Sequence, residues 1–176
     1  MADQTSLTRA DILRLFQSLD GELATDGVEG EIYLVGGAVM CLVFDARPAT
    51  RDVDAVFRPA RLVRQAAARV ALKESLSDTW LNDAVKGYLS PRGDFDPYLE
   101  LPHLRVFTAR PEYLLAMKCA SMRLGAEFHD LDDVRYLLRY LNVSTVDSAL
   151  EIVGRYFDDD ALPAKTRLAL EELLSA

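Results

Sequence analysis

The chain opens with an apolar pattern of helical period. After Thr8, hydrophobic side chains recur three and four residues apart, which places them on one face of a helix; they are Ile12, Leu13, Phe16, Leu19 and Leu23. Thr8 is suited to the N-cap position, and Asp11 three residues later supplies the acid of a capping box. We therefore predict a helix over about residues 9–24, with a turn-rich loop after it.

A strand, a glycine bend and a second apolar segment come next. Residues 32–35 are apolar and partly β-branched, which is typical of a buried strand. Gly36 and Gly37 interrupt this run, and the apolar segment 38–44 predicts a helix packed on the sheet. The Arg–Pro pair at 47–48 is expected to end that helix, because the residue before a proline is disfavoured in the α region.

The rest of the chain alternates between strand and helix patterns and then becomes helical. The predicted elements are a strand over 52–57, a helix over 60–72 with Pro59 at its first position, a short helix over 78–89, strands over 98–101 and 104–108, and helices from Pro111 to the end, the last two over 145–157 and 163–175. This order predicts an α/β (α+β) fold. A core with a small mixed sheet would cover residues 1–110, and a helical lobe would cover 111–176.

Asp52 and Asp54 are the first candidates for chemistry. Residues two apart on a strand point to the same face, and two adjacent carboxylates repel unless a positive charge lies between them. A hard divalent cation such as Mg²⁺ meets this need, since it binds through one or two carboxylates plus substrate phosphates. The backbone N–H groups at Gly36 and Gly37 are suited to hold a phosphate. Together these features outline a site for a nucleoside triphosphate.

The double glycine followed by Asp52-x-Asp54 resembles the signature of the polymerase-β-like nucleotidyltransferase superfamily. The run Arg47-x-x-Thr50-x-Asp52-x-Asp54 is similar, more narrowly, to the AbiEii-type branch, which includes toxins of bacterial toxin–antitoxin systems. The resemblance implies a nucleotidyltransferase fold, Mg²⁺ or Mn²⁺ as cofactor and an NTP as substrate. It also implies that the glycine bend, Thr50 and Arg51 bind the nucleotide. The alternative is an ordinary tight turn beside a solvated strand end.

Three more polar residues are candidates by the same resemblance. Lys118 emerges from an apolar helix, so it either extends to solvent or points at an anion. The resemblance implies that Lys118 contacts the triphosphate and that Asp133 holds this lysine or positions the acceptor. Asp130 and Asp133 share a helix face, although Asp130 could instead be the helix cap. The competing interpretation of Lys118 is that it forms a salt bridge between two helices. Glu100, on a predicted strand, is the candidate third acid, a base or metal ligand; the alternative is an exposed strand glutamate.

Charge and composition limit the function classes. The chain has 28 acidic and 20 basic residues and a net charge of −8, which argues against broad non-specific binding of nucleic acid. A local basic patch is still compatible with a nucleic-acid substrate. The densest basic stretch, residues 58–73, meets phosphates or is a solvated helix face. An acidic surface also suits a basic protein partner.

The remaining signals concern compartment and metals. Cys41 and Cys119 lie in apolar, predicted helical surroundings, which favours buried free thiols in a reducing cytosol. No apolar run approaches the ~20 residues that span a membrane, and no secretory leader is visible, so we expect a cytoplasmic protein without membrane contact. His103 and His129 lack partners at ligand spacing, so zinc is not expected.

The sequence therefore predicts a Mg²⁺-dependent nucleotidyltransferase. It would transfer an NMP from an NTP to a hydroxyl of an RNA, such as a tRNA end, or of a protein, in a toxin–antitoxin or phage-defence setting with a cognate antitoxin or toxin as partner. The alternative keeps the fold without catalysis. In that case the acidic chain binds a protein partner and acts, for example, as an antitoxin.

Overall fold

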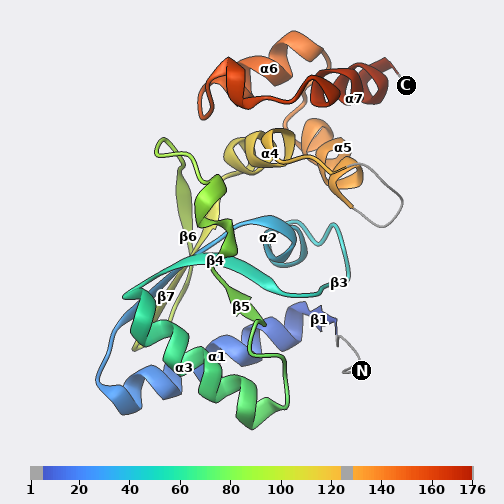
Figure 1. Cartoon of the computed structure of the whole chain (residues 1–176). Helices are drawn as coiled ribbons and strands as arrows, with labels where there is room; N and C mark the ends of the chain where they lie inside the picture. The colour runs from blue at the N-terminus through green and yellow to red at the C-terminus, as the bar shows by residue number, and fades with distance from the viewer. Residues whose placement is uncertain (1–5, 124–128, 176) are drawn as a thin grey trace. The chain divides into compact units, whose positions relative to one another are not determined.

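The computed structural model describes residues 6–123 and 129–175 and divides into two compact units. The first comprises the chain up to Gly87 together with Phe95–Ala109, and the second comprises Tyr88–Asp94 and the chain from Arg110 onward. The boundary predicted between residues 110 and 111 lies next to the break after Ala109, but the segment Tyr88–Asp94 belongs with the helices. The expected α/β class is confirmed, with a mixed sheet in the first unit (Figure 1).

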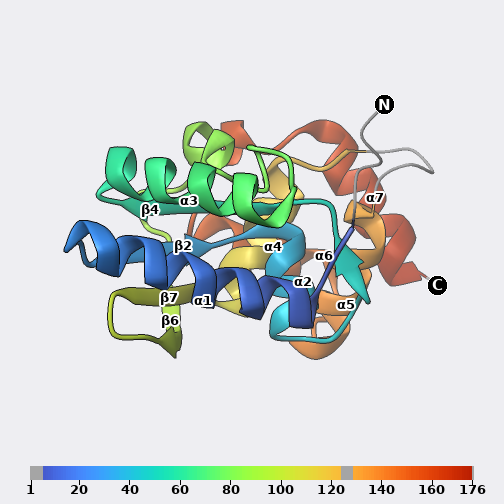
Figure 2. The same cartoon turned by 90° about the horizontal axis from the view of Figure 1, so that it is seen from below.

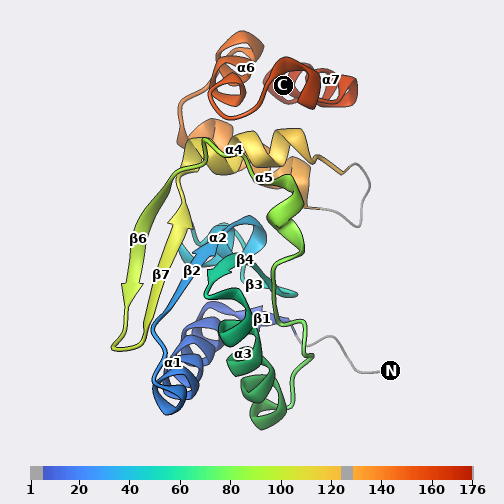
Figure 3. The ribbon, with the colours of Figure 1, turned by 60° about the vertical axis from the view of Figure 1, so that its left-hand side comes forward.

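Five strands form this sheet in the order β5-β4-β2-β7-β6. The central strand β2 pairs antiparallel with β4 and parallel with β7, so both neighbours are distant from it in sequence. The outer strand β5 runs parallel to β4, and β6 forms a long antiparallel hairpin with β7 (Figure 3). The bounds are β2 Gly30–Leu34, β4 Val53–Arg58, β5 Leu81–Asn82, β6 Phe95–Glu100 and β7 Leu104–Ala109, and a separate short pair joins β1 Leu7–Thr8 to β3 Ala49–Thr50.

One face of the sheet is covered by the helices α1 (Arg9–Asp26) and α3 (Ala60–Glu74), which lie side by side beneath it (Figure 2). A β carbon on Gly30 would lie 2.9 Å from Leu23 Cδ1 of α1 and 3.2 Å from Val63 Cγ2 of α3. Because side chains alternate along a strand, Ile32 and Leu34 share this buried face. Ala55 of β4 is paired with Leu34 and lies on the same face, so the preceding residue, Asp54, projects to the other face of the sheet.

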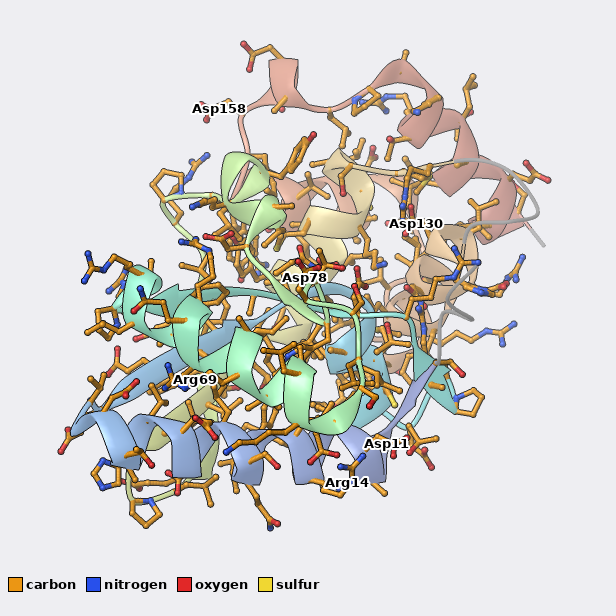
Figure 4. All side chains as sticks on the ribbon, turned by 60° about the horizontal axis from the view of Figure 1, so that its bottom comes forward. Asp11, Arg14, Arg69, Asp78, Asp130 and Asp158 are labelled. Carbon is orange, nitrogen blue, oxygen red and sulfur yellow. The ribbon has the colours of Figure 1, made fainter. Side chains whose placement is uncertain are left out.

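Ionic contacts also join the two helices. Arg69 of α3, labelled in Figure 4, donates through Nε to Glu22 Oε2 of α1 at 2.6 Å, and Lys73 also bonds to this carboxylate. These hydrogen bonds, from Lys73 and then Arg69, hold the pKa of Glu22 below its usual value although burial acts to raise it. Glu22 is therefore a buried carboxylate whose charge is compensated, as such groups require.

The predicted start of the first helix is confirmed. Thr8 Oγ1 accepts from the Asp11 backbone N–H at 3.2 Å, and the Thr8 N–H donates to Asp11 Oδ2 at 2.9 Å. These two bonds complete a capping box. The helix ends at Gly27, whose φ of 64° is the left-handed conformation that favours glycine.

Two predicted helix limits are wrong. The helix α2 covers Gly36–Leu42, so it begins at the glycine bend and ends before the Arg–Pro pair that was expected to stop it. The chain instead turns at Asp45, which has a φ of 51°, and the Ala46 N–H bonds to Met40 O at 3.0 Å. Pro59 is the N-cap of α3, one position earlier than predicted.

Segment 78–89 and the loop predicted before residue 98 also differ from expectation. Trp80 is buried and its indole N–H donates to Ala67 O at 3.0 Å, while the Val53 N–H donates to Trp80 O at 2.7 Å. These long-range bonds make Leu81–Asn82 the strand β5, and only a 3₁₀ turn, η1 (Ala84–Tyr88), follows. β6 begins at Phe95, inside the predicted loop, because its register with β7 starts opposite Ala109.

The described part of the second unit is helical. α4 begins with Pro111 in its first turn, as predicted, and its apolar side chains form much of the buried core. α7 is joined to α4 by the buried Thr166 hydroxyl, which donates to Cys119 O at 2.9 Å. The bounds are α4 Pro111–Ala120, α5 Asp130–Tyr140, α6 Val146–Gly154, the 3₁₀ turn η2 Asp159–Ala161, and α7 Ala164–Ser175.

The prediction of buried free thiols is confirmed for both cysteines. Cys41 and Cys119 are buried free thiols that form no disulfide, and burial raises the pKa of the Cys119 thiol to about 12. Within 6–123 and 129–175, every helix is too short or too polar to traverse a lipid bilayer.

The capping box gives a direct test of the first helix. Thr8→Ala removes the acceptor for the Asp11 N–H and should lower the free energy of unfolding by about 1 kcal/mol. Urea denaturation followed by circular dichroism measures this change. Thr25→Ala, the same change near the other end of α1, should stay within about 0.5 kcal/mol of the parent protein. Equal effects of the two substitutions would contradict the capping role.

Candidate functional site

The glycine bend and the aspartate strand lie against each other in the first unit. Antiparallel pairing of β2 with β4 places Leu34 opposite Ala55, and the Val35 N–H donates to Asp54 O at 3.0 Å. The next residue, Gly36, has a φ of 65°. A β carbon on Gly36 would lie 3.3 Å from Asp54 Oδ2, so the carboxylate lies directly over the bend.

Gly37 is in equally close contact with two side chains from the loop before β4. A β carbon at Gly37 would lie 2.8 Å from Arg47 Nη1 and 2.9 Å from Thr50 Oγ1. Thr50 is buried, and its hydroxyl donates to Asp52 O at 3.2 Å. Arg47 and Thr50 thus hold the loop against the bend, at a distance that leaves no room for a β carbon on residue 37.

Asp52 lies immediately before β4 and is positioned from the other side by Asn82. β5 pairs with β4 so that Asn82 is opposite Asp54, and Asn82 Nδ2 donates to Asp52 Oδ2 at 3.3 Å. Both aspartates are half-buried, so solvent still reaches them. Sequence analysis did not include Arg47 or Asn82 among the site residues. Arg47 could have been predicted, because it is the first residue of the motif that contains Thr50, Asp52 and Asp54. Asn82 could not, because it reaches Asp52 only through the pairing of β5 with β4.

The donors at this bend fit a hard divalent cation. Asp52 and Asp54 supply carboxylate oxygens, which matches Mg²⁺ or Mn²⁺ chemistry. In the described ranges, no group of three or more His, Cys, Asp or Glu residues is arranged to hold a metal ion. A cation here would therefore have two protein carboxylates and complete its shell with water and phosphate oxygens.

Two other predicted residues lie differently. Arg51 is exposed, next to Asp52 in the chain. Glu100 is also exposed, and the sheet register puts it in one row with Arg105, Glu31 and Arg58. Arg58 is four residues from Asp54 along β4, roughly 13 Å at ~3.3 Å per residue. The structure therefore does not bring Glu100 together with Asp52 and Asp54.

Lys118 and Asp133 are brought together in the second unit, and Asp130 joins them. Lys118 Nζ lies 2.8 Å from Asp133 Oδ2 and 3.0 Å from Asp130 Oδ1. The three side chains are only 11%, 5% and 4% exposed, respectively. Asp130, labelled in Figure 4, is the first residue of α5 and not its cap, which is His129. The helix–helix salt bridge considered above is therefore present.

Asp130 has further donors. Arg123 donates to Asp130 Oδ2 through Nε and through its backbone N–H, both at 3.0 Å. Burial is the largest single influence and acts to raise the pKa of Asp130, but the bonds from Arg123 and the charge of Lys118 outweigh it and lower that pKa. Asp130 thus stays ionised in a buried site. The sequence predicted only Asp133 as the partner of Lys118, because the approach of α4 to α5 depends on tertiary packing.

No protein-family model, curated protein or solved structure matches this chain. Function must therefore be inferred from the residues themselves. They include a carboxylate pair over a glycine bend in the first unit and a buried lysine held by two aspartates in the second.

The lysine cluster allows a prediction about stability and pH. Lys118→Met leaves two buried carboxylates without their shared cation and should destabilise the protein by about 3–5 kcal/mol near pH 7. Because the folded-state pKa of Asp130 is lowered, its stabilisation is present above the unfolded aspartate pKa of about 3.9 and is lost as pH falls through the folded value. The difference between variant and parent should therefore shrink below about pH 4.

Thermal denaturation from pH 3 to 7 measures this dependence. Lys165→Met, at an exposed position of α7, is the matched control and should be nearly neutral. A penalty for Lys118→Met that is unchanged at pH 3 would show that lost packing, and not the ion pairs, is responsible.

Proposed function

We propose that this protein is a Mg²⁺-dependent nucleotidyltransferase that transfers an NMP from an NTP to a hydroxyl acceptor. The observation that supports this best is the contact of the Asp54 carboxylate with Gly36. It places a pair of hard oxygen donors beside a glycine bend, and glycine lets the backbone approach a phosphate closely. A polyphosphate with a bound cation would use the carboxylates for the cation and the backbone N–H groups for the phosphates.

The glycine bend would hold the phosphates. Gly36 and Gly37 begin α2, and its N-cap residue Val35 has no side-chain acceptor for the first N–H groups. Such N–H groups attract anions. Thr50 and Arg47, against Gly37, add a hydroxyl and a guanidinium at the same place, and guanidinium groups pair well with phosphate oxygens.

Asp52 and Asp54 would bind the cation and orient the reacting groups. Bound Mg²⁺ or Mn²⁺ supplies charge neutralisation of the triphosphate. The acceptor oxygen then forms a bond to the α-phosphorus, the bond from that phosphorus to the pyrophosphate oxygen breaks, and the hydroxyl proton leaves to solvent. Asn82 contributes by fixing the rotamer of Asp52. Catalysis of this kind depends on positioning and electrostatics.

The proposed acceptor is a hydroxyl of an RNA, such as a tRNA end, or of a protein. The proposed setting is a toxin–antitoxin or phage-defence system with a cognate partner protein. This proposal uses the residues of the first unit. The nucleotide contacts of Lys118 and Asp133 remain a prediction from the resemblance, because the Lys118 ammonium group lies against the carboxylates of Asp133 and Asp130.

A specific observation favours a second candidate, a non-catalytic protein-binding module. The described residues offer two carboxylates at the bend, and Glu100 lies in the row of Arg58, away from it. A fold that keeps the sheet but lacks a third acid would retain a binding surface without catalysis. Absence of Mg²⁺-dependent NTP binding, together with tight binding of a partner protein, would favour this function.

The main test is label transfer. The protein is incubated with Mg²⁺, each α-³²P-labelled NTP and total RNA, and label is followed on RNA and on protein. Asp52→Asn and Asp54→Asn should each reduce transfer by about 100-fold or more, since each removes a carboxylate ligand of the cation that neutralises the triphosphate. Asp78→Asn, at an exposed position labelled in Figure 4, is the matched control and should keep full transfer.

Glu100→Gln provides an internal comparison in the same assay. The register of the sheet predicts that it keeps most of the activity. Transfer that survives both Asp52→Asn and Asp54→Asn would contradict the proposed site. Label on RNA, or on protein, identifies the class of acceptor.

Asn82 gives a more selective test. Asn82→Ala removes the hydrogen bond that Asn82 donates to Asp52 without removing a proposed cation ligand, so transfer should fall by about 10–100-fold with a higher Mg²⁺ requirement. Titration of activity with Mg²⁺ measures both effects. Gln17→Ala removes an exposed amide from α1 and should change neither. An unchanged Mg²⁺ requirement in Asn82→Ala would show that Asn82 does not orient Asp52.

A further inference from the structure

A polar cavity lies in the second unit. Its volume is about 350 Å³, and it is lined by Arg92, Asp94, Arg110, Glu112, Arg155 and Tyr156. Three arginines around one cavity are notable in a chain with a net charge of −8. Guanidinium groups bind phosphate and carboxylate oxygens in a bidentate manner, so this cavity is suited to an anion.

The wall of the cavity is preorganised. The Ser90 N–H donates to the Tyr113 hydroxyl at 3.0 Å, and the Ser90 hydroxyl bonds to Tyr156 O. A β carbon on Gly93 would lie 2.4 Å from the Tyr113 ring, so the loop that carries Arg92 and Asp94 packs directly on that ring. A cavity that needs little ordering on binding loses little affinity to entropy.

Asp94 places a hydrogen-bond acceptor in the cavity, beside the arginines. Its Oδ1 atom is buried, and none of the described residues donates a hydrogen bond to it. A buried acceptor without a donor is costly, so it favours a ligand that carries a hydroxyl or amine. Burial, and next a hydrogen bond with the Asp94 side chain, raise the pKa of Tyr156 to about 12, so this phenol keeps its proton.

The arginines have partners that an anion can replace. Arg92 Nη2 lies 3.0 Å from Asp158 Oδ1, and the Asp158 side chain is 83% exposed. Arg155 Nη2 lies 3.9 Å from Glu151 Oε1, which is also well exposed. Arg110 Nη1 is 4.0 Å from Asp94 Oδ2. Exposed ion pairs of this kind contribute little to stability, so exchanging them for phosphate contacts is inexpensive.

We propose that this cavity binds a ribose phosphate. The phosphate would contact Arg92, Arg110 and Arg155, and a ribose hydroxyl would donate to Asp94 Oδ1. The volume is at the small end of ligand sites and matches one nucleotide unit. The ribose phosphate belongs either to an RNA chain or to a free ribonucleotide. The cavity contains none of the residues assigned to nucleotidyl transfer, so this site is independent of the proposed function.

Fluorescence anisotropy with a labelled 12-nucleotide single-stranded RNA and with DNA of the same sequence tests the proposal. The RNA should bind more tightly than the DNA, and Arg92→Gln combined with Arg155→Gln should weaken RNA binding by about tenfold or more. Arg135→Gln combined with Arg139→Gln removes the same charge from exposed positions of α5 and should change binding by less than about twofold.

Asp94→Asn tests the hydroxyl contact while keeping the side-chain shape. It should reduce the preference for RNA over DNA and leave DNA binding nearly unchanged. Competition by AMP at micromolar concentration would identify a free ribonucleotide as sufficient, whereas failure of AMP to compete would identify the RNA chain. Equal competition by inorganic phosphate and AMP would overturn the ribose contact.

Two results would overturn the site as a whole: absence of RNA and AMP binding, or equal weakening by the two double variants. Circular dichroism of each variant establishes that it is folded. Asp52→Asn separates this proposal from the first, because it should abolish label transfer and leave RNA affinity within about twofold. A protein that binds RNA but transfers no label would contradict the proposed nucleotidyl transfer and keep the cavity site. A protein that transfers label but loses no RNA affinity in Arg92→Gln combined with Arg155→Gln would contradict the cavity site alone.

Discussion

The candidate nucleotide site depends on the absence of two β carbons. At Gly36 the constraint is conformational as well as steric, because a φ of 65° is strained for other residues and a β carbon would be 3.3 Å from the Asp54 carboxylate. At Gly37 the constraint is steric, with Arg47 and Thr50 within 3 Å of the same position. Any side chain here would separate the bend from the carboxylate and from the loop before β4.

The mixed sheet explains which acids meet this bend. Antiparallel pairing of β2 and β4 brings the end of one strand to the start of the other, so Gly36 and Asp54 are neighbours although they are 18 positions apart in the sequence. Parallel pairing of β4 with β5 adds Asn82 beside Asp52. The same register sends Glu100 away along the sheet. The charge arrangement is thus a consequence of strand order.

The sequence was sufficient where structure depends on local periodicity. The capping box at Thr8, the strand before Gly36 and the helix at Pro111 were all visible as spacing of apolar and capping residues. Long-range pairing was not visible. Leu81–Asn82 became a strand because Trp80 and Val53 bond across the fold, and Asp130 reached Lys118 because α4 and α5 approach each other. The arginine cavity is built from three separate segments and leaves no local motif.

The discontinuous second unit has a consequence for biosynthesis. The loop Tyr88–Asp94 leaves the ribosome before Tyr113 and Tyr156, the residues on which Ser90 and Gly93 are seated. The first unit, in contrast, has all of its strands once Ala109 has been translated. We therefore expect the nascent chain to form its sheet first, while this loop waits for Tyr113 and then Tyr156 to be made. A fragment beginning at residue 111 would lack the loop altogether and expose the two tyrosines it normally covers.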